Sequence, residues 1–294
     1  MLAILGCGEI SLFELYCCVR YHLFLTTFWC RLTHITPRKS KAMSTHERPF
    51  EQPLKAYENL EFLHSHQARS IRVLCEMEEP KDRFAKAGID NTIVFFGSAR
   101  TPDPEKEETP SKQSRFYGDA RELAKRLTKW SLEMHHGRHS YAICSGGGPG
   151  IMEAANRGAH DAGGKSVALG ISLPMEQGVN EYADPDLAFE FHYFFVRKYW
   201  FAYMAKAIVV FPGGFGTMDE LFEVVTLMQT HKIQKRVPIV LYGKEFWNDI
   251  VNFDKFIEWG TISPGDVNLF QIMDSIDEAE QYLIKEMTKV APTA

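Results

Sequence analysis

The residues best suited to chemistry form one run, Pro-Gly-Gly-Phe-Gly-Thr-Met-Asp-Glu at 212–220, directly behind the apolar segment 207–211. The pattern predicts a buried strand, a glycine turn, and a helix that begins near Thr217. Glycines let backbone N–H groups approach a ligand closely, and a helix N-terminus carries partial positive charge, so the turn suits a phosphate group. Glu220 adds a group capable of acid–base or electrostatic work. The run therefore indicates an enzyme that acts on a phosphorylated small molecule.

A second glycine turn contains Gly146, Gly147 and Gly148 behind another predicted strand. The dinucleotide-binding fingerprint needs G-x-G-x-x-G at the first strand of a sheet. When the fingerprint is aligned from Gly146, its final glycine falls on Ile151, and when it is aligned from Gly148, its final glycine falls on Glu153. The turn also follows the second predicted strand, not the first. A nicotinamide or flavin cofactor is therefore not expected. The turn either lines a ligand site or is a tight turn without a ligand.

Residues 159–166 match a permissive nucleotide-triphosphate loop pattern, with alanine in the first place and Gly-Lys-Ser at the end. Such a loop needs a strand before it and a helix after it. The pattern here predicts a helix before the loop and a strand, 166–171, after it. Glycine at this place is typical of a helix C-terminus, so the sequence excludes ATP hydrolysis through this motif.

Arg197 and Lys198 stand inside an aromatic segment, 191–201. Cations in such surroundings must reach water, pair with a carboxylate, or meet an anionic ligand. The aromatic residues suit either a core or the surface of a dimer. Ser98 and Arg100 follow the first predicted strand, where they either contact a nucleotide or are a turn serine and a surface arginine.

Composition and charge limit the class of protein. The 294 residues are 45% hydrophobic and 24% charged, which is ordinary for a globular protein with a sizeable core. The net charge of -5 disfavours a nucleic-acid binder that relies on a basic surface. Most of the six cysteines lie near the N-terminus, and the rest of the chain has no disulfide or zinc framework, so we expect a cytoplasmic protein.

Residues 1–42 differ in composition from the rest of the chain. They are rich in Leu, Phe, Tyr and Cys, but Glu9 and Glu14 interrupt the apolar run, and charges inside a membrane-spanning helix are costly. No basic leader with a small-residue cleavage site is evident, and Met43 opens a polar segment that resembles a protein start. We expect 1–42 to be a non-native or disordered upstream extension, in preference to a membrane anchor, followed by an N-terminal helical segment at 43–90.

Beyond residue 90, short apolar runs alternate with helical patterns. This alternation predicts an α/β fold over 91–294, a Rossmann-like doubly wound parallel sheet with helices on both faces. Ligands in such sheets lie at the carboxyl ends of strands, and both glycine turns follow strands. The expected strands are 92–96, 141–144, 166–171, 207–211 and 238–241, with a weaker one at 270–273; the expected helices are 114–130, 151–162, 194–204, 218–230, 245–259 and 277–288, after one or two within 54–86.

Together these motifs resemble the LOG (Lonely Guy) family of nucleoside-monophosphate phosphoribohydrolases, long mislabelled as lysine decarboxylases. The family carries an R-K pair shortly before P-G-G-x-G-T-x-x-E, and an earlier G-G-G-x-x-G turn. Here the pair at 197–198 and the run at 212–220 match without a gap, while Gly150 comes one place early. The similarity extends over 91–289. One departure concerns the base pocket, since Phe194 stands where the family often has Met.

The resemblance implies hydrolysis of the N-glycosidic bond of a nucleoside 5′-monophosphate, AMP or a cytokinin riboside 5′-monophosphate, to free base and ribose 5-phosphate, with no metal or organic cofactor. Cleavage develops positive charge on the ribose, which a nearby carboxylate stabilises while it positions water. Glu220 is expected in that role, with Arg197 holding Glu220 or the sugar hydroxyls, or polarising the base. The expected substrate-binding residues are Gly213, Gly214, Gly216 and Thr217 at the phosphate, Gly146, Gly147, Gly148 and Ser98 at the ribose and base, and Lys198.

Other functions and partners follow from the same residues. A pyridoxal-phosphate decarboxylase is not expected, because the pair at 231–232 lacks a cofactor scaffold. The alternative is a non-catalytic nucleotide-binding sensor or carrier of Rossmann-like fold, which intact Arg197 and Glu220 disfavour. Asp219 is expected to support the helix N-terminus, since its side chain points about 100° away from that of Glu220. The resemblance also implies a homodimer or higher homo-oligomer, with the aromatic helix as a candidate interface, and leaves the preferred base open.

Overall fold

The computed structural model describes residues 52–107, 111–172 and 178–289. The chain divides into two units, Met1–Lys55 and Ala56–Ala294, and the second holds all the described helices and strands. Within the described ranges, no helix has the length and apolar character needed to cross a membrane. The extension expected at 1–42 lies outside the described residues, and the boundary expected after residue 90 stays a prediction.

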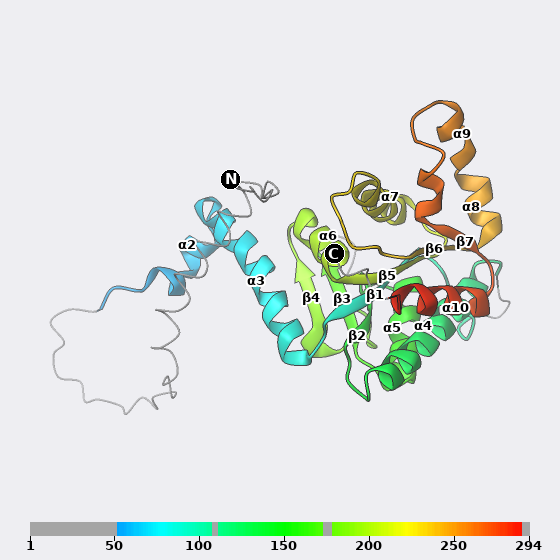
Figure 1. Cartoon of the computed structure of the whole chain (residues 1–294). Helices are drawn as coiled ribbons and strands as arrows, with labels where there is room; N and C mark the ends of the chain where they lie inside the picture. The colour runs from blue at the N-terminus through cyan, green and yellow to red at the C-terminus, as the bar shows by residue number, and fades with distance from the viewer. Residues whose placement is uncertain (1–51, 108–110, 173–177, 290–294) are drawn as a thin grey trace, which may run out of the picture. The chain divides into compact units, whose positions relative to one another are not determined.

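A parallel sheet forms the centre of the second unit. Its strands are β1 (Asn91–Phe96), β2 (Tyr141–Ser145), β3 (Ser166–Ile171), β4 (Ala188–Phe191), β5 (Ala205–Val210), β6 (Ile239–Tyr242) and β7 (Gln271–Met273). The seven strands lie in the order β4-β3-β2-β1-β5-β6-β7 (Figure 1). The chain proceeds in one direction from β1 to β4 and then returns to the other side of β1 with β5. The predicted doubly wound α/β sheet is confirmed, and its switch point lies between β1 and β5.

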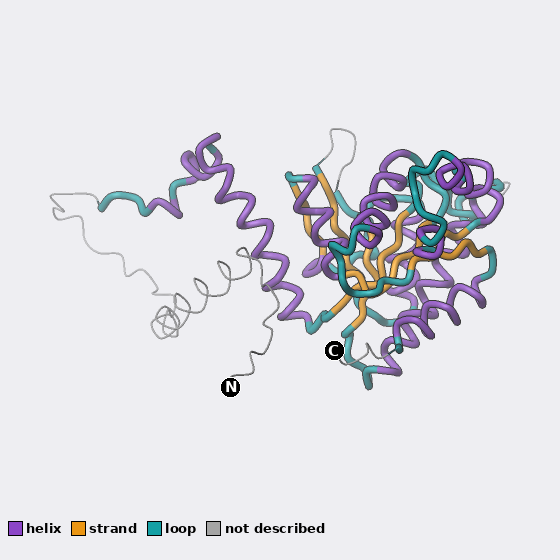
Figure 2. Tube along the Cα trace, turned by 45° about the horizontal axis from the view of Figure 1, so that its top comes forward, coloured by secondary structure: helices purple, strands orange, loops and turns teal. Residues whose placement is uncertain are grey.

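Helices cover both faces of this sheet (Figures 1 and 2). The described α-helices are α2 (Leu60–His64), which lies beyond the sheet, α3 (Arg69–Ala87), α4 (Ser114–Met134), α5 (Ile151–Asp161), α6 (Phe194–Met204), α7 (Phe215–Gln229), α8 (Lys244–Ile250), α9 (Phe253–Glu258) and α10 (Ile276–Met287). Strand β1 shows how two cores form, because successive side chains of a strand point to opposite faces. Ile93 and Phe95 pack with α4, α5 and α10, whereas Val94 and Phe96 pack with α3, α6, α7 and α8.

The structure differs from the prediction in two elements. The single helix expected at 245–259 is wrong, because Val251 takes an extended conformation and the Asn252 side chain accepts a hydrogen bond from the Lys255 N–H, which starts α9. Strand β4 was not expected. It has 4 residues, too few for a clear alternation, and it depends on pairing with β3.

Helix α3 positions the aromatic helix α6. The Glu76 carboxylate accepts hydrogen bonds from the N–H groups of His192 (2.9 Å) and Tyr193 (3.2 Å), and Trp200 Nε1 donates to the Glu76 carbonyl (3.0 Å). Since the N–H groups around a helix start need acceptors outside the helix, Glu76 stabilises the beginning of α6. An N-terminal helix thereby fixes the element that carries Arg197.

Candidate active site

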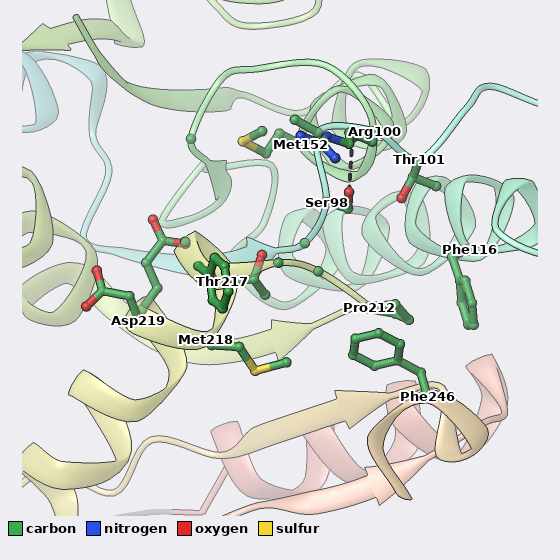
Figure 3. Close-up of a pocket in the computed structure, with 18 of the residues that line it drawn as sticks. Ser98, Arg100, Thr101, Phe116, Met152, Pro212, Thr217, Met218, Asp219 and Phe246 are labelled. Carbon is green, nitrogen blue, oxygen red and sulfur yellow. Dashed lines mark hydrogen bonds between the residues drawn. The ribbon is translucent and has the colours of Figure 1, made fainter. Parts of the chain in front are cut away.

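A cavity of about 770 Å³ lies at the carboxyl edge of the sheet, where β1 and β5 end (Figure 3). Its walls come from the segments that follow β1, β2 and β5, from the end of β3, and from α4, α5, α6, α7 and α8. An open parallel sheet binds ligands at this place, and the volume is in the range of small-molecule sites. The structure brings Ser98, Gly146, Arg197 and Glu220 into the wall together with the turn at 212–217.

The glycine turn brings the open N-terminus of α7 to the cavity. The helix begins at Phe215, earlier than the start expected near Thr217, with Gly214 as its N-cap. The N–H of Met218 donates to the Gly214 carbonyl (3.0 Å), so the N–H groups before it have no acceptor within the helix. They carry the positive end of the helix dipole. Because Gly214, Phe215, Gly216 and Thr217 all line the cavity, an anion there would meet these donors.

Glycine at position 213 is required by the packing of Thr217. A Cβ on Gly213 would lie 2.2 Å from Thr217 Oγ1, far inside contact distance. Thr217 is buried, with 6% of its surface exposed, yet it still contributes to the cavity wall. Any side chain at Gly213 would therefore displace the hydroxyl group that the sequence predicts at the phosphate.

Further along α7, Glu220 forms an ion pair with Arg197 of α6, in which Oε1 and Nη1 are 3.5 Å apart. The side chains of Arg197 and Glu220 are only 10% and 16% exposed. Burial raises the pKa of Glu220 to about 7, against the opposing effect of the Arg197 guanidinium. A carboxyl group with this pKa exchanges a proton near neutral pH, as a general acid or base must.

Contacts from the sheet fix Arg197. Its Nε donates to the Leu169 carbonyl on β3 (2.8 Å), and its guanidinium carbon lies 5.2 Å from the centroid of the Phe201 ring. A Cβ on Gly146 would lie 2.6 Å from Arg197 Nη2. The first glycine of the second turn thus makes room for the guanidinium group, a role that the sequence analysis did not foresee.

Lys198, the neighbour of Arg197, does not line this cavity. Its Nζ lies 2.7 Å from Asp219 Oδ2 and 3.1 Å from Glu223 Oε2. Lys198 therefore joins α6 to α7. Asp219 was expected to support the helix N-terminus, and its observed partner is Lys198.

Two asparagines that the sequence analysis did not single out hold the second glycine turn. Asn180 Nδ2 donates to the carbonyls of Gly147 (3.0 Å) and Gly148 (3.2 Å), and to Asn156 Oδ1 (2.9 Å). Asn156 is completely buried, at 0% exposed, and its amide also donates to Ser166 Oγ (2.6 Å). Gly147 and Gly148, which were expected at the ribose and base, are not among the residues that line the cavity, whereas Gly146 is. A polar side chain among the small apolar residues of α5 is the signal that could have indicated Asn156.

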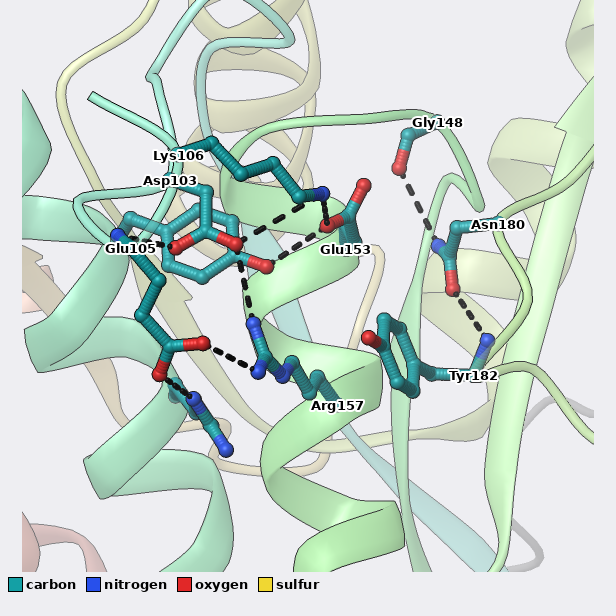
Figure 4. A network of polar contacts seen from close by, with 10 residues as sticks. Asp103, Glu105, Lys106, Gly148, Glu153, Arg157, Asn180 and Tyr182 are labelled. Carbon is teal, nitrogen blue, oxygen red and sulfur yellow. Dashed lines mark hydrogen bonds and ion pairs between the residues drawn. The ribbon is translucent and has the colours of Figure 1, made fainter. Parts of the chain in front are cut away.

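Ion pairs anchor the loop that follows β1 (Figure 4). Arg157 of α5 reaches Asp103 Oδ2 (3.0 Å) and Glu105 Oε2 (2.7 Å). Asp103 is only 7% exposed, so the loop is packed against α5 at this residue. The same loop begins at Ser98, which lines the cavity and accepts a hydrogen bond from the backbone of Arg100. The network thus holds one wall of the cavity in place.

The polar groups of the cavity are suited to an anion and to proton exchange. Within the residues that the structure describes, no three His, Cys, Asp or Glu side chains are grouped to hold a metal ion. The wall instead presents the N–H groups of α7, the cations Arg100 and Arg197, and the carboxyl groups of Asp219 and Glu220. This arrangement can hold an anion at the end of α7 and exchange a proton at a buried carboxyl group on the same helix.

Comparisons with known proteins find a matching family model and several relatives. A family model described as "Possible lysine decarboxylase" matches residues 152–283. A probable cytokinin riboside 5′-monophosphate phosphoribohydrolase of Oryza sativa subsp. japonica is 28% identical over 217 residues, which cover 72% of this chain and 83% of that protein. A cytokinin riboside 5′-monophosphate phosphoribohydrolase of Arabidopsis thaliana is 28% identical over 221 residues, which cover 74% of this chain and 90% of that protein.

Among solved structures, a Moco carrier protein from Chlamydomonas reinhardtii is similar with a TM-score of 0.43 and 20% identity, covering 68% of this chain and 99% of that one. The matched segment 152–283 contains the R-K pair at 197–198 and the run at 212–220. With these motifs at one cavity and these relatives, the chain is similar to the LOG family and to the proteins described as possible lysine decarboxylases.

Proposed function

We propose that this protein hydrolyses the N-glycosidic bond of a nucleoside 5′-monophosphate, AMP or a cytokinin riboside 5′-monophosphate, to free base and ribose 5-phosphate. One observation carries the proposal: the buried ion pair of Arg197 and Glu220 shares a cavity wall with the open N-terminus of α7. The relatives named phosphoribohydrolases support the same reaction class.

The 5′-phosphate would bind at the N-terminus of α7. Its oxygens would accept hydrogen bonds from the N–H groups of the turn at Gly213, Gly214 and Gly216, and from the hydroxyl group of Thr217. Each charge-assisted bond of this kind contributes about 1.5–3 kcal/mol. A phosphorylated ligand would therefore bind much more tightly than a plain nucleoside.

Glu220 would act at the anomeric carbon. As the C1′–N bond breaks, positive charge develops on the ribose ring, and an ionised carboxylate nearby stabilises it. The same carboxylate can accept the proton of the attacking water, which contributes on the order of 10²–10⁴ in rate. Arg197 keeps the carboxylate in position through the ion pair at 3.5 Å.

The ribose and base would extend toward Ser98 and Gly146, which line the cavity on the side of β1 and β2. Phe194 lines the same cavity and is in place to contact the base. The proposal assigns Lys198 to positioning, because Asp219 and Glu223 already hold its amine.

Incubation with AMP, followed by chromatography of adenine and ribose 5-phosphate, tests this proposal. Wild type is expected to release both products in equal amounts, and Glu220→Ala to lose at least 10²-fold in rate. Glu258→Ala, which removes a carboxylate that is 59% exposed on α9 and outside the cavity, is the matched control and should retain activity. Tight binding of AMP without turnover would refute catalysis and favour a nucleotide sensor. A panel of adenine, isopentenyladenine, guanine and pyrimidine monophosphates then identifies the preferred base.

We further propose that the protein is a homodimer that buries the aromatic face of α6. Phe194, Phe195 and Tyr203 are 50%, 58% and 58% exposed, and exposed apolar patches of this kind mark interaction surfaces. Light scattering is expected to give twice the chain mass, and Phe195→Glu to give a monomer. A wild-type monomer at micromolar concentration would refute the dimer.

A further inference from the structure

The cavity extends beyond the part that a nucleoside monophosphate would occupy. Along the sheet edge the strands follow the order β3-β2-β1-β5-β6, with neighbours about 5 Å apart. Arg197 bonds to Leu169 on β3 and lies against Gly146, which follows β2. The reactive pair thus lies on one side of the turn after β5. Phe246, on the helix after β6, lines the cavity on the other side.

This other part of the cavity has apolar walls. Figure 3 shows the side chains of Phe116, Pro212 and Phe246 on the opposite side of Thr217 from Asp219. We call it the β6 compartment and define it by four lining residues, Phe116, Pro212, Phe246 and Ile250. A monophosphate that reaches from the α7 N-terminus to Glu220 would leave this compartment empty of ligand.

Packing holds the walls of the β6 compartment in place. Phe116 is 8% exposed, and a Cβ on Gly243 would lie 2.9 Å from its ring and 3.3 Å from Pro212 Cγ. Gly243 has a φ of 99°, so glycine is required there for both conformation and space. Phe246 packs edge-on against Trp247, with ring centroids 5.3 Å apart. The compartment is therefore preformed, which favours binding of a rigid apolar group.

The charges around the β6 compartment do not suit a second phosphate. None of its four defining residues is charged. Glu245, next to Phe246 in the sequence, forms an ion pair with Lys112. Arg115, beside Phe116, pairs with Asp274 at 2.8 Å. Because carboxylates already pair with both cations, neither is free to bind a second anionic group.

We propose that the β6 compartment binds an apolar or aromatic group esterified to the 5′-phosphate, so that the protein also accepts nucleoside 5′-phosphodiesters. The inference rests on the proposed function, since the phosphate at α7 sets the direction of the ligand. A diester keeps two non-bridging oxygens and one negative charge for the N–H groups of α7, while its remaining ester oxygen leads past Pro212.

The reaction on such a diester leaves the phosphate ester intact. The oxygen of water bonds to C1′, the C1′–N bond breaks, and the proton from water passes through Glu220 to the departing base. The products are the free base and a ribose 5-phosphate that still carries its ester group. No oxidant, reductant or further reactant is needed.

The experiment compares adenosine 5′-(phenyl phosphate) with AMP. Calorimetry measures the binding of both ligands to the Glu220→Gln variant, which should not hydrolyse them. Product formation is measured separately with the wild-type protein. The phenyl ester is expected to bind at least as tightly as AMP. Adding Phe246→Ala should weaken the ester about 3- to 10-fold more than AMP, which is the contribution of one aromatic pair.

Two further variants keep the test decisive even if Phe246→Ala disturbs folding. Ile250 is 59% exposed, so Ile250→Trp should leave the core intact while filling the compartment, and it should weaken the ester more than AMP. Phe256→Ala, on α9 at a position 39% exposed and outside the cavity, is the matched control and should leave the ratio of the two affinities unchanged.

The possible outcomes separate the two proposals. If AMP binds and is cleaved but the ester does not compete even in large excess, the inference about the β6 compartment is overturned and the proposed function stands. The inference is also overturned if Phe246→Ala and Ile250→Trp leave the affinity for the ester, relative to that for AMP, unchanged. If neither ligand binds, the proposed function fails as well.

Discussion

Replacement of Glu220 by glutamine is expected to stabilise the protein in a manner that depends on pH. Burial raises the pKa of Glu220 from the usual 4.5 to about 7 in the folded protein. Between those two pH values the folded state therefore holds one more proton than the unfolded state. Stability falls with pH wherever the folded state binds more protons, so wild type should lose stability as the pH rises from about 4.5 to about 7.

The size of this effect follows from the pKa. Each pKa unit corresponds to about 1.4 kcal/mol, so ionising Glu220 in the folded protein costs about 3 kcal/mol. Glutamine has nearly the same shape and no proton to lose. The free energy of unfolding of Glu220→Gln should therefore match wild type near pH 4.5 and exceed it by up to about 3 kcal/mol above pH 8. For a domain of this size that is about 6–12 °C in Tm.

Urea unfolding of both proteins, followed by tryptophan fluorescence from about pH 5 to about pH 8.5, measures this difference. Glu258→Gln is the matched control, because its carboxylate is 59% exposed on α9, away from Glu220, and its effect on stability should change little over that range. A difference between Glu220→Gln and wild type that stays constant across the range would show that Glu220 is not held protonated by burial, and the argument for its role near neutral pH would fail.

The remaining predictions concern the same cavity. The kcat/KM for AMP should fall about tenfold per pH unit below the Glu220 pKa of about 7 and level off above it; a flat profile would contradict a base role. Arg197 lowers the pKa of Glu220, so Arg197→Met should move the break in the residual activity to higher pH, and a move to lower pH would refute the ion-pair argument. Gly213→Ala should raise KM on the order of tenfold, since losing one hydrogen bond at the displaced Thr217 costs about 1.4 kcal/mol; an unchanged KM would show that this hydroxyl does not bind phosphate.

Local patterns in the sequence were sufficient for the fold class. Apolar runs such as 166–171 are buried on both faces of a parallel sheet, and their alternation with helical patterns depends only on neighbouring residues. The run at 212–220 likewise predicted a glycine turn and a helix start, because glycine and proline act on the backbone at their own positions. Boundaries were less certain, as the break between α8 and α9 within 245–259 shows.

The site depended on contacts between residues far apart in the chain. That Gly146 leaves space for Arg197, and that Lys198 is held by Asp219 and Glu223, follows from the packing of α6 against the sheet and α7. The raised pKa of Glu220 is a consequence of burial, which no local pattern records.

The sequence by itself thus determined which groups could do chemistry: a phosphate turn, a carboxylate and an arginine, because these are properties of residue types and their spacing. Only the tertiary structure decided which of these groups meet in one cavity, which are held elsewhere, and that an apolar compartment adjoins the phosphate turn at β6. The physical reason is that burial, ion pairing and cavity shape depend on distances set by the whole sheet and its covering helices.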